Sequence, residues 1–554
     1  MKKSKVFLLA AVGLLSVGVL TACSSSSKTS GKTYNYVYGS DPATLDYLAT
    51  NKKNMTTAVS NGVDGLFEND QYGNLKPSVA EDWSVSQDGL TYTYKIRKGL
   101  KWYTSDGEEY ANVTAKDFVT GLKHAADTNS EAIYLLQNSV KGLNDYLSGA
   151  NKDFSNVGIK AVDDYTLQYT LSQPEPYWNS KLTYSVTWPV NGDFLKSKGK
   201  DFGKSTDPTS ILYNGPYLLK ALTTKSSIEF TKNENYWDKD HVYFDNIKLT
   251  YDDGSDQESL ERNFTDGVYN LARLFPTSSN YSKVEKQYKD NIFYTQPGSA
   301  VEGVGINIDR QTYGHTSKEN DQQKTSTKTA LLNKDFRQSL GFAIDRTNYA
   351  AQLNGKEGGS TAVRNIFVKP DFVQADGKDF GTMVMDQLPA YGDEWSGVNL
   401  ADSQDGLYNP EKAKAEFAKA KEALQAEGVQ FPIHLDVPVN QSSKITVNQV
   451  QSIKQSVESA LGKDNVVLDI HQLSADDFNN ITYSASNAAA EDWDLSVGVA
   501  WDPDYLDPST YLDVLKTTSS ENTKSFMGYD DPNSQAVQKV GLKEYDQLVE
   551  DASK

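Results

Sequence analysis

The sequence LSVGVAW, residues 495–501, runs directly into DPDYLDP, residues 502–508. The first stretch is short and mostly apolar, which is typical of a buried strand, and the prolines of the second stretch end it abruptly. This change predicts that Trp501 and Asp504 lie at the end of a strand. In α/β proteins, strand ends that face a cleft are the usual place for ligand-binding side chains.

Two interpretations of Trp501 and Asp504 stay open at this level. An aromatic ring beside a carboxylate suits a ligand that combines a cationic amine with an apolar body. The same pair also fits a core tryptophan that precedes a turn aspartate, and the local sequence alone favours this simpler interpretation.

The rest of the chain mixes strand and helix patterns. Residues 90–96 alternate with period two and follow the turn residues 87–89, which predicts a hairpin with residues 83–85. Thr114 and Asp117 form a capping box at a predicted helix start. Further strands are predicted at residues 166–171, 228–231 and 247–251, and further helices at residues 409–427 and 450–461. We find no repeat period, so the sequence predicts a mixed α/β fold.

The N-terminus resembles a secretion signal. Three lysines precede an apolar run, residues 6–20, that is too short and wrongly flanked to span a bilayer in the mature protein. The run ends in LTAC, residues 20–23, which resembles the lipobox of bacterial lipoproteins. We therefore expect a signal peptide at residues 1–22 and a lipid on Cys23. The alternative is an ordinary signal peptide that happens to contain a cysteine.

Cys23 is the only cysteine of the chain, so no internal disulfide is possible. Residues 23–32, CSSSSKTSGK, are rich in serine and predict a flexible tether behind the lipid. No later segment is apolar enough over its length to span a membrane. We therefore expect an extracytoplasmic protein, anchored through its lipid to the outer face of the cell membrane.

The chain is acidic, with a net charge of −19, and removal of the signal would take away lysines but no acidic residue. Binding to nucleic acid needs basic patches, so we expect no nucleic-acid partner. A length of 554 residues suggests two or more domains.

Motifs of enzymes are not found. The sequence contains neither a glycine-rich phosphate loop followed by Lys and Ser or Thr nor a G-x-S-x-G motif. Its five histidines are scattered without the spacing of metal ligands, so we expect no metal and no cofactor. A glycosidase stays an alternative, because paired carboxylates can hydrolyse glycosides. The densest carboxylate cluster consists of Glu491, Asp492, Asp494, Asp502, Asp504 and Asp507.

A series of motifs follows in order along the chain. They are DPATLD (41–46), LKPSVAEDW (75–83), GLTYTYKIRKGLKW (89–102), DG (106–107), TAKDF (114–118), NGPY (214–217), ENYWD (234–238), FRQSLGFAIDR (336–346) and WDPDYLDP (501–508). Together they resemble the family 5 solute-binding proteins of ABC importers, and specifically the oligopeptide-binding lipoproteins of Gram-positive bacteria such as streptococci. Each motif alone is weak, but their order along nearly the whole mature chain is specific.

This resemblance implies a two-lobed α/β clamshell of the periplasmic-binding-protein type, with mixed sheets. It places lobe I in residues 33–72 and 187–300, an extra subdomain of lobe I in residues 73–186, and lobe II in residues 301–530. One lobe closes on the other around a peptide, and the closed form docks on a permease. The protein is expected to be a monomer.

The resemblance also implies a return of the chain to lobe I after lobe II. Residues 531–554 begin a predicted helix that has no stop signal, and family members continue past the matching helix. We therefore expect the return to lobe I to be missing and the hinge to be incomplete.

The resemblance assigns the ligand contacts to two strand ends. The six candidate residues are Asp504, Trp501, Tyr505, Val499, Tyr36 and Tyr38. In family members that hold the free amine of a peptide, the acid lies in a W-x-x-D-Y motif, and here that acid is Asp504. Residues 33–38 and 499–501 are expected to pair with the main chain of an extended peptide, as an added β-strand.

The function implied by the resemblance is the capture of oligopeptides and their delivery to the membrane subunits of an ABC permease, without catalysis. One alternative is the same fold with another ligand, such as an oligosaccharide, haem or nickel, although the few histidines argue against metals. Another alternative is a receptor for a peptide pheromone.

Overall fold

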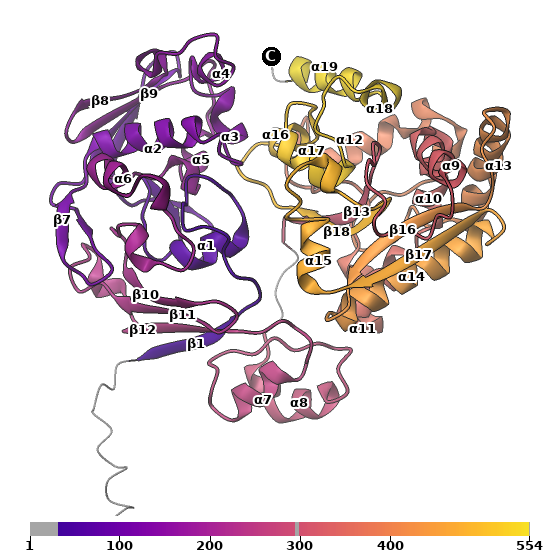
Figure 1. The fold of residues 1–554 in the computed structure, drawn as a ribbon, viewed down its shortest axis with the longest axis horizontal. Coiled ribbons are helices and arrows are strands. Elements are labelled where there is room, and N and C mark those ends of the chain that lie inside the picture. The colour runs from indigo at the N-terminus through magenta and orange to yellow at the C-terminus, as the bar shows by residue number, and fades with distance from the viewer. Residues whose placement is uncertain (1–31, 294–297, 553–554) are drawn as a thin grey trace, which may run out of the picture.

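The computed structural model of the chain describes residues 32–293 and 298–552 (Figure 1). The predicted signal peptide, Cys23 and all but the last residue of the predicted tether lie outside these ranges. Figure 1 shows two bodies side by side, one coloured indigo to magenta and the other mainly salmon to yellow. We call them lobe I (residues 33–251) and lobe II (residues 301–552), and residues 252–300 connect them.

Lobe I contains two four-stranded sheets. Its strands are β1 (Thr33–Tyr38), β2 (Phe67–Asn69), β3 (Leu75–Pro77), β4 (Ala80–Val85), β5 (Thr91–Ile96), β6 (Lys101–Tyr103), β7 (Glu109–Asn112), β8 (Ile159–Asp163), β9 (Thr166–Thr170), β10 (Tyr217–Thr223), β11 (Ser227–Lys232) and β12 (Asn246–Tyr251). One sheet has the order β1-β12-β11-β10 and is mixed, because β1 runs parallel to β12 while the other pairs are antiparallel. The other has the order β4-β5-β9-β8 and is antiparallel.

The helices of lobe I contribute apolar residues to the same core as these sheets. They are α1 (Lys53–Val59), α2 (Ala115–Asp127), α3 (Tyr134–Gln137), α4 (Leu143–Leu147), α5 (Trp178–Lys181) and α6 (Gly192–Lys198). The predicted hairpin is confirmed as β4 and β5, and Gly89 in its turn has a φ of 72° that favours glycine. The predicted capping box at α2 is also confirmed, because the backbone N–H of Thr114 donates to Asp117 at 2.9 Å.

Lobe II has a separate core around a parallel pair of strands. Its strands are β13 (Val301–Ile306), β14 (Gln374–Ala375), β15 (Lys378–Asp379), β16 (Ile433–Asn440), β17 (Val466–Leu473) and β18 (Leu495–Trp501). The strands β16 and β17 pair in parallel, and β18 pairs antiparallel with β13. The bounds of β18 are those predicted from the sequence.

The helices of lobe II flank these strands. They are α9 (Asp321–Leu332), α10 (Lys334–Ala343), α11 (Arg346–Gly358), α12 (Phe380–Gln387), α13 (Pro410–Ala426), α14 (Lys444–Leu461), α15 (Ala475–Asn480), α16 (Ser509–Leu512), α17 (Ser520–Met527), α18 (Gln535–Lys539) and α19 (Leu542–Ala552). The helices predicted at residues 409–427 and 450–461 are confirmed as α13 and α14. Both contribute apolar residues to the core of lobe II. The predicted mixed α/β architecture is therefore confirmed in both lobes.

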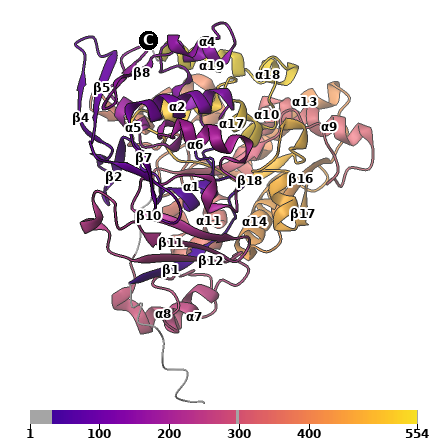
Figure 2. The same cartoon turned by 60° about the vertical axis from the view of Figure 1, so that its left-hand side comes forward.

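The connection between the lobes carries two short helices, α7 (Ser259–Thr265) and α8 (Tyr281–Tyr288). Figures 1 and 2 both place these helices beneath the sheet that contains β1. The connection is attached to that sheet by Asn270, which pairs with the backbone of Asn35.

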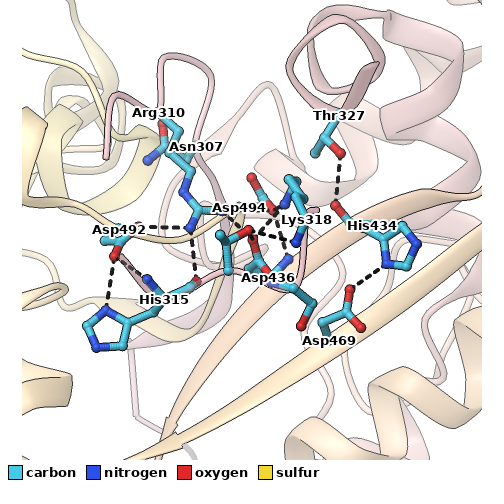
Figure 3. Close-up of polar contacts among 12 residues, drawn as sticks. Asn307, Arg310, His315, Lys318, Thr327, His434, Asp436, Asp469, Asp492 and Asp494 are labelled. Carbon is cyan, nitrogen blue, oxygen red and sulfur yellow. Dashed lines mark hydrogen bonds and ion pairs between the residues drawn. The ribbon is translucent and has the colours of Figure 1, made fainter. Parts of the chain in front are cut away.

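A cluster of buried charges lies in lobe II between β16, the start of β18 and the loop after β13 (Figure 3). The guanidinium of Arg310 lies 2.7 Å from Asp436 and 2.8 Å from Asp492. The ammonium of Lys318 lies 2.6 Å from Asp436 and also contacts Asp494. All five side chains are almost fully buried. The cluster therefore joins three separate segments of lobe II through charge.

Asp436 is at the centre of this cluster. Its carboxylate also accepts hydrogen bonds from the hydroxyl of Thr316 at 2.7 Å and the backbone N–H of Ser317 at 2.9 Å, and His471 Nε2 lies 2.8 Å away. Burial acts to raise the pKa of Asp436, but the contacts with His471 and Lys318 outweigh it and hold the pKa well below its usual range. The carboxylate is therefore ionised in the folded protein at neutral pH.

We expect Asp436→Asn to destabilise the protein strongly at neutral pH. Breaking a buried ion pair leaves uncompensated charge and lowers the free energy of unfolding by about 3–5 kcal/mol. Because the pKa of Asp436 is lowered by folding, its contribution is present above about pH 4 and is lost as the pH falls further. Urea titrations of the wild type and of Asp436→Asn measure the free energy of unfolding of each. The difference between the two values should therefore become smaller as the pH falls below about 4.

Asp386→Asn is the matched control for this prediction. Asp386 pairs with Lys378 at 2.6 Å on the surface of lobe II, where both side chains are more than half exposed. Loss of such a pair changes stability by under about 1 kcal/mol. If Asp436→Asn and Asp386→Asn lowered the free energy of unfolding equally, the buried cluster would contribute no more to stability than an exposed ion pair does.

Candidate functional site

A cavity of 2060 Å3 lies where lobe I, the connection and lobe II meet. Tyr36 of β1 lines it from lobe I, and residues 271–274 and Pro276 line it from the connection. Lobe II contributes residues 301–304 of β13, residues of α10 and α11, and Ala500 near the end of β18. A cavity of this volume has room for a ligand larger than an ordinary small molecule.

The predicted contact residues of β1 lie in different surroundings. Tyr36 faces the cavity. Tyr38 is buried in the core of lobe I, and its hydroxyl donates to Asp41 at 2.9 Å. The backbone of Asn35 is already paired, because its N–H donates to the side chain of Asn270 at 2.7 Å and its C=O accepts from the Asn270 N–H at 3.0 Å.

The end of β18 is open to solvent. The first residues of the strand are buried, whereas Gly498 and Ala500 are exposed and Val499 is half-buried. In the part of the chain that the structure describes, β18 pairs with β13 alone. Residues 498–500 are therefore at least partly exposed, and Ala500 among them lines the cavity.

Asp504 lies three residues after the end of β18, at the boundary between the lobes. Its Oδ2 accepts a hydrogen bond from the hydroxyl of Tyr134 at 2.7 Å, and its Oδ1 accepts one from the hydroxyl of Tyr184. Both tyrosines belong to lobe I, Tyr134 at the start of α3 and Tyr184 shortly after α5. The backbone N–H of Asp504 donates to the hydroxyl of Thr510 at 2.7 Å, which orients the carboxylate from the side of lobe II.

The electrostatic surroundings of Asp504 favour a partner with positive charge. Burial raises its pKa to about 6, although the hydrogen bonds from Tyr184 and Tyr134 and the charge of Lys181 act in the opposite direction. The carboxylate is therefore largely ionised at pH 7 and about half protonated near pH 6. A bound ammonium group would compensate this charge better than neutral hydroxyls do.

Tyr505 attaches the same segment to lobe I. Its ring stacks on the ring of Tyr177 with centroids 5.2 Å apart, and the ammonium of Lys181 lies 4.3 Å from its centroid. The next residue, Leu506, donates its backbone N–H to Ser180 Oγ at 3.4 Å. Tyr505 is therefore part of the core of lobe I although it follows a strand of lobe II.

Trp501, by contrast, stays with lobe II. Its indole N–H donates to the backbone carbonyl of Thr510 at 3.0 Å, and the ring packs in a small cluster with Val301 and Tyr511. Its ring centroid also lies 6.3 Å from that of Tyr134 in lobe I. Residues 502–504 therefore connect Trp501, which packs in lobe II, to Tyr505, which packs in the core of lobe I.

Two further contacts join the lobes away from Asp504. Lys225, in the turn between β10 and β11, lies 3.1 Å from Asp476 of α15. The ammonium of Lys52 lies 5.6 Å from the ring of Tyr483. The structure therefore shows the lobes in contact with each other.

The carboxylates that suggested a glycosidase are largely engaged in structural contacts. Asp492 and Asp494 belong to the buried ion cluster of Figure 3, and Glu491 accepts a hydrogen bond from the indole of Trp493 at 2.6 Å. Among residues 32–293 and 298–552, no three His, Cys, Asp or Glu side chains are grouped to hold a metal ion. None of the helices in these ranges is both long and apolar enough to cross a bilayer.

Comparison with known proteins places the chain in a family. Residues 74–523 match the bacterial extracellular solute-binding proteins, family 5. The oligopeptide-binding protein AmiA of Streptococcus pneumoniae serotype 4 is 68% identical over 557 residues, covering 100% of this chain and 84% of AmiA.

Two solved structures are similar in fold. Listeria monocytogenes OppA bound to peptide has a TM-score of 0.69 at 23% identity, covering 94% of this chain and 90% of that one. The pheromone receptor PrgZ also has a TM-score of 0.69 at 23% identity, covering 94% and 92%. These likenesses confirm the predicted two-lobed fold of the periplasmic-binding-protein type. With more than half of its length matched and a relative at 68% identity, this chain belongs to the bacterial extracellular solute-binding proteins of family 5.

Proposed function

We propose that this chain captures oligopeptides between its lobes and delivers them to the membrane subunits of an ABC permease, without catalysing a reaction. The observation that carries this proposal is the cavity lined from both lobes beside the open end of β18. The relationship to AmiA, an oligopeptide-binding protein, supports the same class of ligand.

The peptide would bind mainly through its backbone. An extended chain that pairs with residues 498–500 forms main-chain hydrogen bonds, which do not depend on the peptide sequence. The volume of the cavity leaves space for side chains of different size, with water filling the remainder. Tyr36, which lines the cavity from lobe I, would contact the peptide side chains.

The free amine of the peptide would be held by Asp504. The carboxylate is close in sequence to the accessible end of β18 and carries negative charge that neutral hydroxyls compensate only in part. Trp501 and Tyr505 position the segment from lobe II and lobe I respectively. A charged hydrogen bond of this kind contributes about 1.5–3 kcal/mol.

The wider organisation is part of the same proposal. Residues 73–186 would form the extra subdomain of lobe I, which the antiparallel sheet β4-β5-β9-β8 within this range supports. Cys23 would carry a lipid that anchors the protein, as a monomer, to the outer face of the cell membrane. The serine-rich residues 24–32 would serve as its tether.

Native mass spectrometry of the purified mature protein tests the class of ligand. We expect a ladder of co-purified peptides that differ in mass and sequence, because backbone pairing tolerates many side chains. A single defined peptide would favour the pheromone receptor instead. An oligosaccharide adduct, or a failure of added peptides to bind, would exclude oligopeptide capture.

Replacement of Cys23 tests the anchor. We expect Cys23→Ser to move the protein from the membrane fraction to the culture medium when it is expressed in a Gram-positive host, because the serine hydroxyl cannot take the thioether-linked lipid. Ser24→Ala is the matched control and should stay with the membrane. Membrane retention of the Cys23→Ser protein would rule out lipidation at this position.

A further inference from the structure

We propose that Glu302 of β13 forms an acidic subsite of the cavity, which selects peptides that carry a lysine or arginine side chain at one position. This inference rests on the proposed function and deepens it, because it names one class among the peptides that the cavity would bind. It concerns a side chain of the peptide and not its terminal amine.

Glu302 lies on the strand next to the exposed end of β18. The strands β13 and β18 run side by side (Figure 1), and Glu302 is the antiparallel partner of Ala500. Directly opposite residues of an antiparallel pair point to the same face of the sheet. Both side chains therefore share the face that lines the cavity, and Glu302 is exposed there.

The carboxylate of Glu302 extends over β18. A Cβ atom at Gly498 would lie 3.9 Å from Glu302 Oε1. Gly498 has a φ of 88°, which favours glycine, and Ala500 carries only a methyl group. These two residues therefore do not separate the carboxylate from the edge of β18 at which the peptide would pair. Neighbouring strands lie about 4.8 Å apart, a distance that a lysine or arginine side chain can span.

Glu302 has only a neutral partner in the protein. The hydroxyl of Tyr349 in α11 donates a hydrogen bond to Glu302 Oε1. In the described parts of the chain, no lysine, arginine or histidine forms an ion pair with Glu302. A carboxylate offers about four lone-pair positions, so most of them stay available to a cationic side chain of the peptide.

Tyr349 acts as a positioning residue for this carboxylate. Its ring packs against the core of lobe II, and its backbone N–H donates to the carbonyl of Asp345 at 3.0 Å. Burial and the charge of Glu302 raise the pKa of Tyr349, so its hydroxyl stays protonated and remains a donor. The hydrogen bond therefore fixes one oxygen of the carboxylate beside β18.

Other charged side chains that line the cavity already have partners of opposite charge. The guanidinium of Arg364 lies 3.2 Å from Asp402 and also donates to three backbone carbonyls. The ammonium of Lys369 contacts Asp371. These charges are therefore compensated before a ligand binds, whereas the charge of Glu302 is not.

A bound peptide would change the surroundings of Glu302. It would displace water from the cavity, and a carboxylate that loses water without gaining a cation is costly to bury. A lysine or arginine side chain supplies that cation, whereas an apolar or acidic side chain leaves the charge uncompensated. The selection therefore combines an attraction to one class of peptide with a penalty against the others.

Calorimetric titration of the mature protein with pools of hexapeptides tests this inference. In each pool five positions are random among uncharged residues, and the sixth is fixed as lysine or as norleucine, whose side chain resembles that of lysine without the ammonium group. Pairs of pools place the fixed residue at each position in turn. A further pair carries glutamate or glutamine at the position where lysine has the largest effect.

Three variants change the subsite in different ways. Glu302→Gln removes the charge and keeps an oxygen that accepts from Tyr349. Glu302→Lys reverses the charge, and Tyr349→Phe removes the hydroxyl but keeps the ring. Glu411→Gln is the control, because Glu411 is an exposed carboxylate of α13 that pairs with Lys414 at 2.9 Å. Binding of the norleucine pools with wild-type affinity shows that each variant is folded.

For the wild type we expect the lysine pool to bind about tenfold more tightly than the norleucine pool at one position. The ratio should be smaller at the adjacent positions, whose side chains point to the opposite face. Glu302→Gln should bring the ratio to about one, and Tyr349→Phe should lower it at least about twofold. Glu302→Lys should favour the glutamate pool over the glutamine pool. Glu411→Gln should keep the wild-type ratio.

The outcomes distinguish this inference from the function on which it rests. If the wild type binds no pool, oligopeptide capture is wrong and the inference falls with it. If the wild type binds the lysine and norleucine pools equally at every position, the acidic subsite is wrong while peptide capture stands. If Glu302→Gln keeps the wild-type ratio, another group makes the selection and the inference is overturned. An unchanged ratio in Tyr349→Phe alone would show that this hydroxyl has no positioning role.

Discussion

The contact of one carboxylate in lobe II with two hydroxyls of lobe I sets the geometry of the whole candidate site. Asp504 accepts hydrogen bonds from Tyr134 and Tyr184 across the boundary between the lobes. Its partial desolvation has a cost that neutral donors offset only in part, and this is why its pKa is raised to about 6. The site therefore has a physical reason to prefer a cationic ligand.

The segment that carries Asp504 is held from both sides. Trp501 packs in lobe II, while Tyr505 stacks on Tyr177 in the core of lobe I. A relative movement of the lobes therefore acts directly on residues 502–504. The buried ion cluster around Asp436 joins the loop after β13 to β16. It therefore stabilises the part of lobe II from which β18 leads to residues 502–504.

Local patterns in the sequence predicted the elements of the site but not their partners. The apolar run and the prolines gave β18 with its true bounds, and the capping box predicted the start of α2. Tyr134 and Tyr184 were missed because they lie 370 and 320 residues from Asp504, and no short-range pattern links residues so far apart. The period-two alternation of a strand likewise predicts that Tyr36 and Tyr38 lie on the same face of β1. Only the structure shows that Tyr36 lines the cavity while Tyr38 is buried in the core of lobe I.

The charge of Asp504 is the central element of this account, and the protons exchanged on peptide binding test it most directly. Calorimetry with a free-amine peptide at pH 6, in two buffers of different protonation enthalpy, measures that exchange. Because a half-protonated carboxylate becomes fully ionised when it pairs with an ammonium group, we predict release of about half a proton per peptide, absent in Asp504→Asn. Binding without proton release at pH 6, or equal release by the variant, would contradict the account.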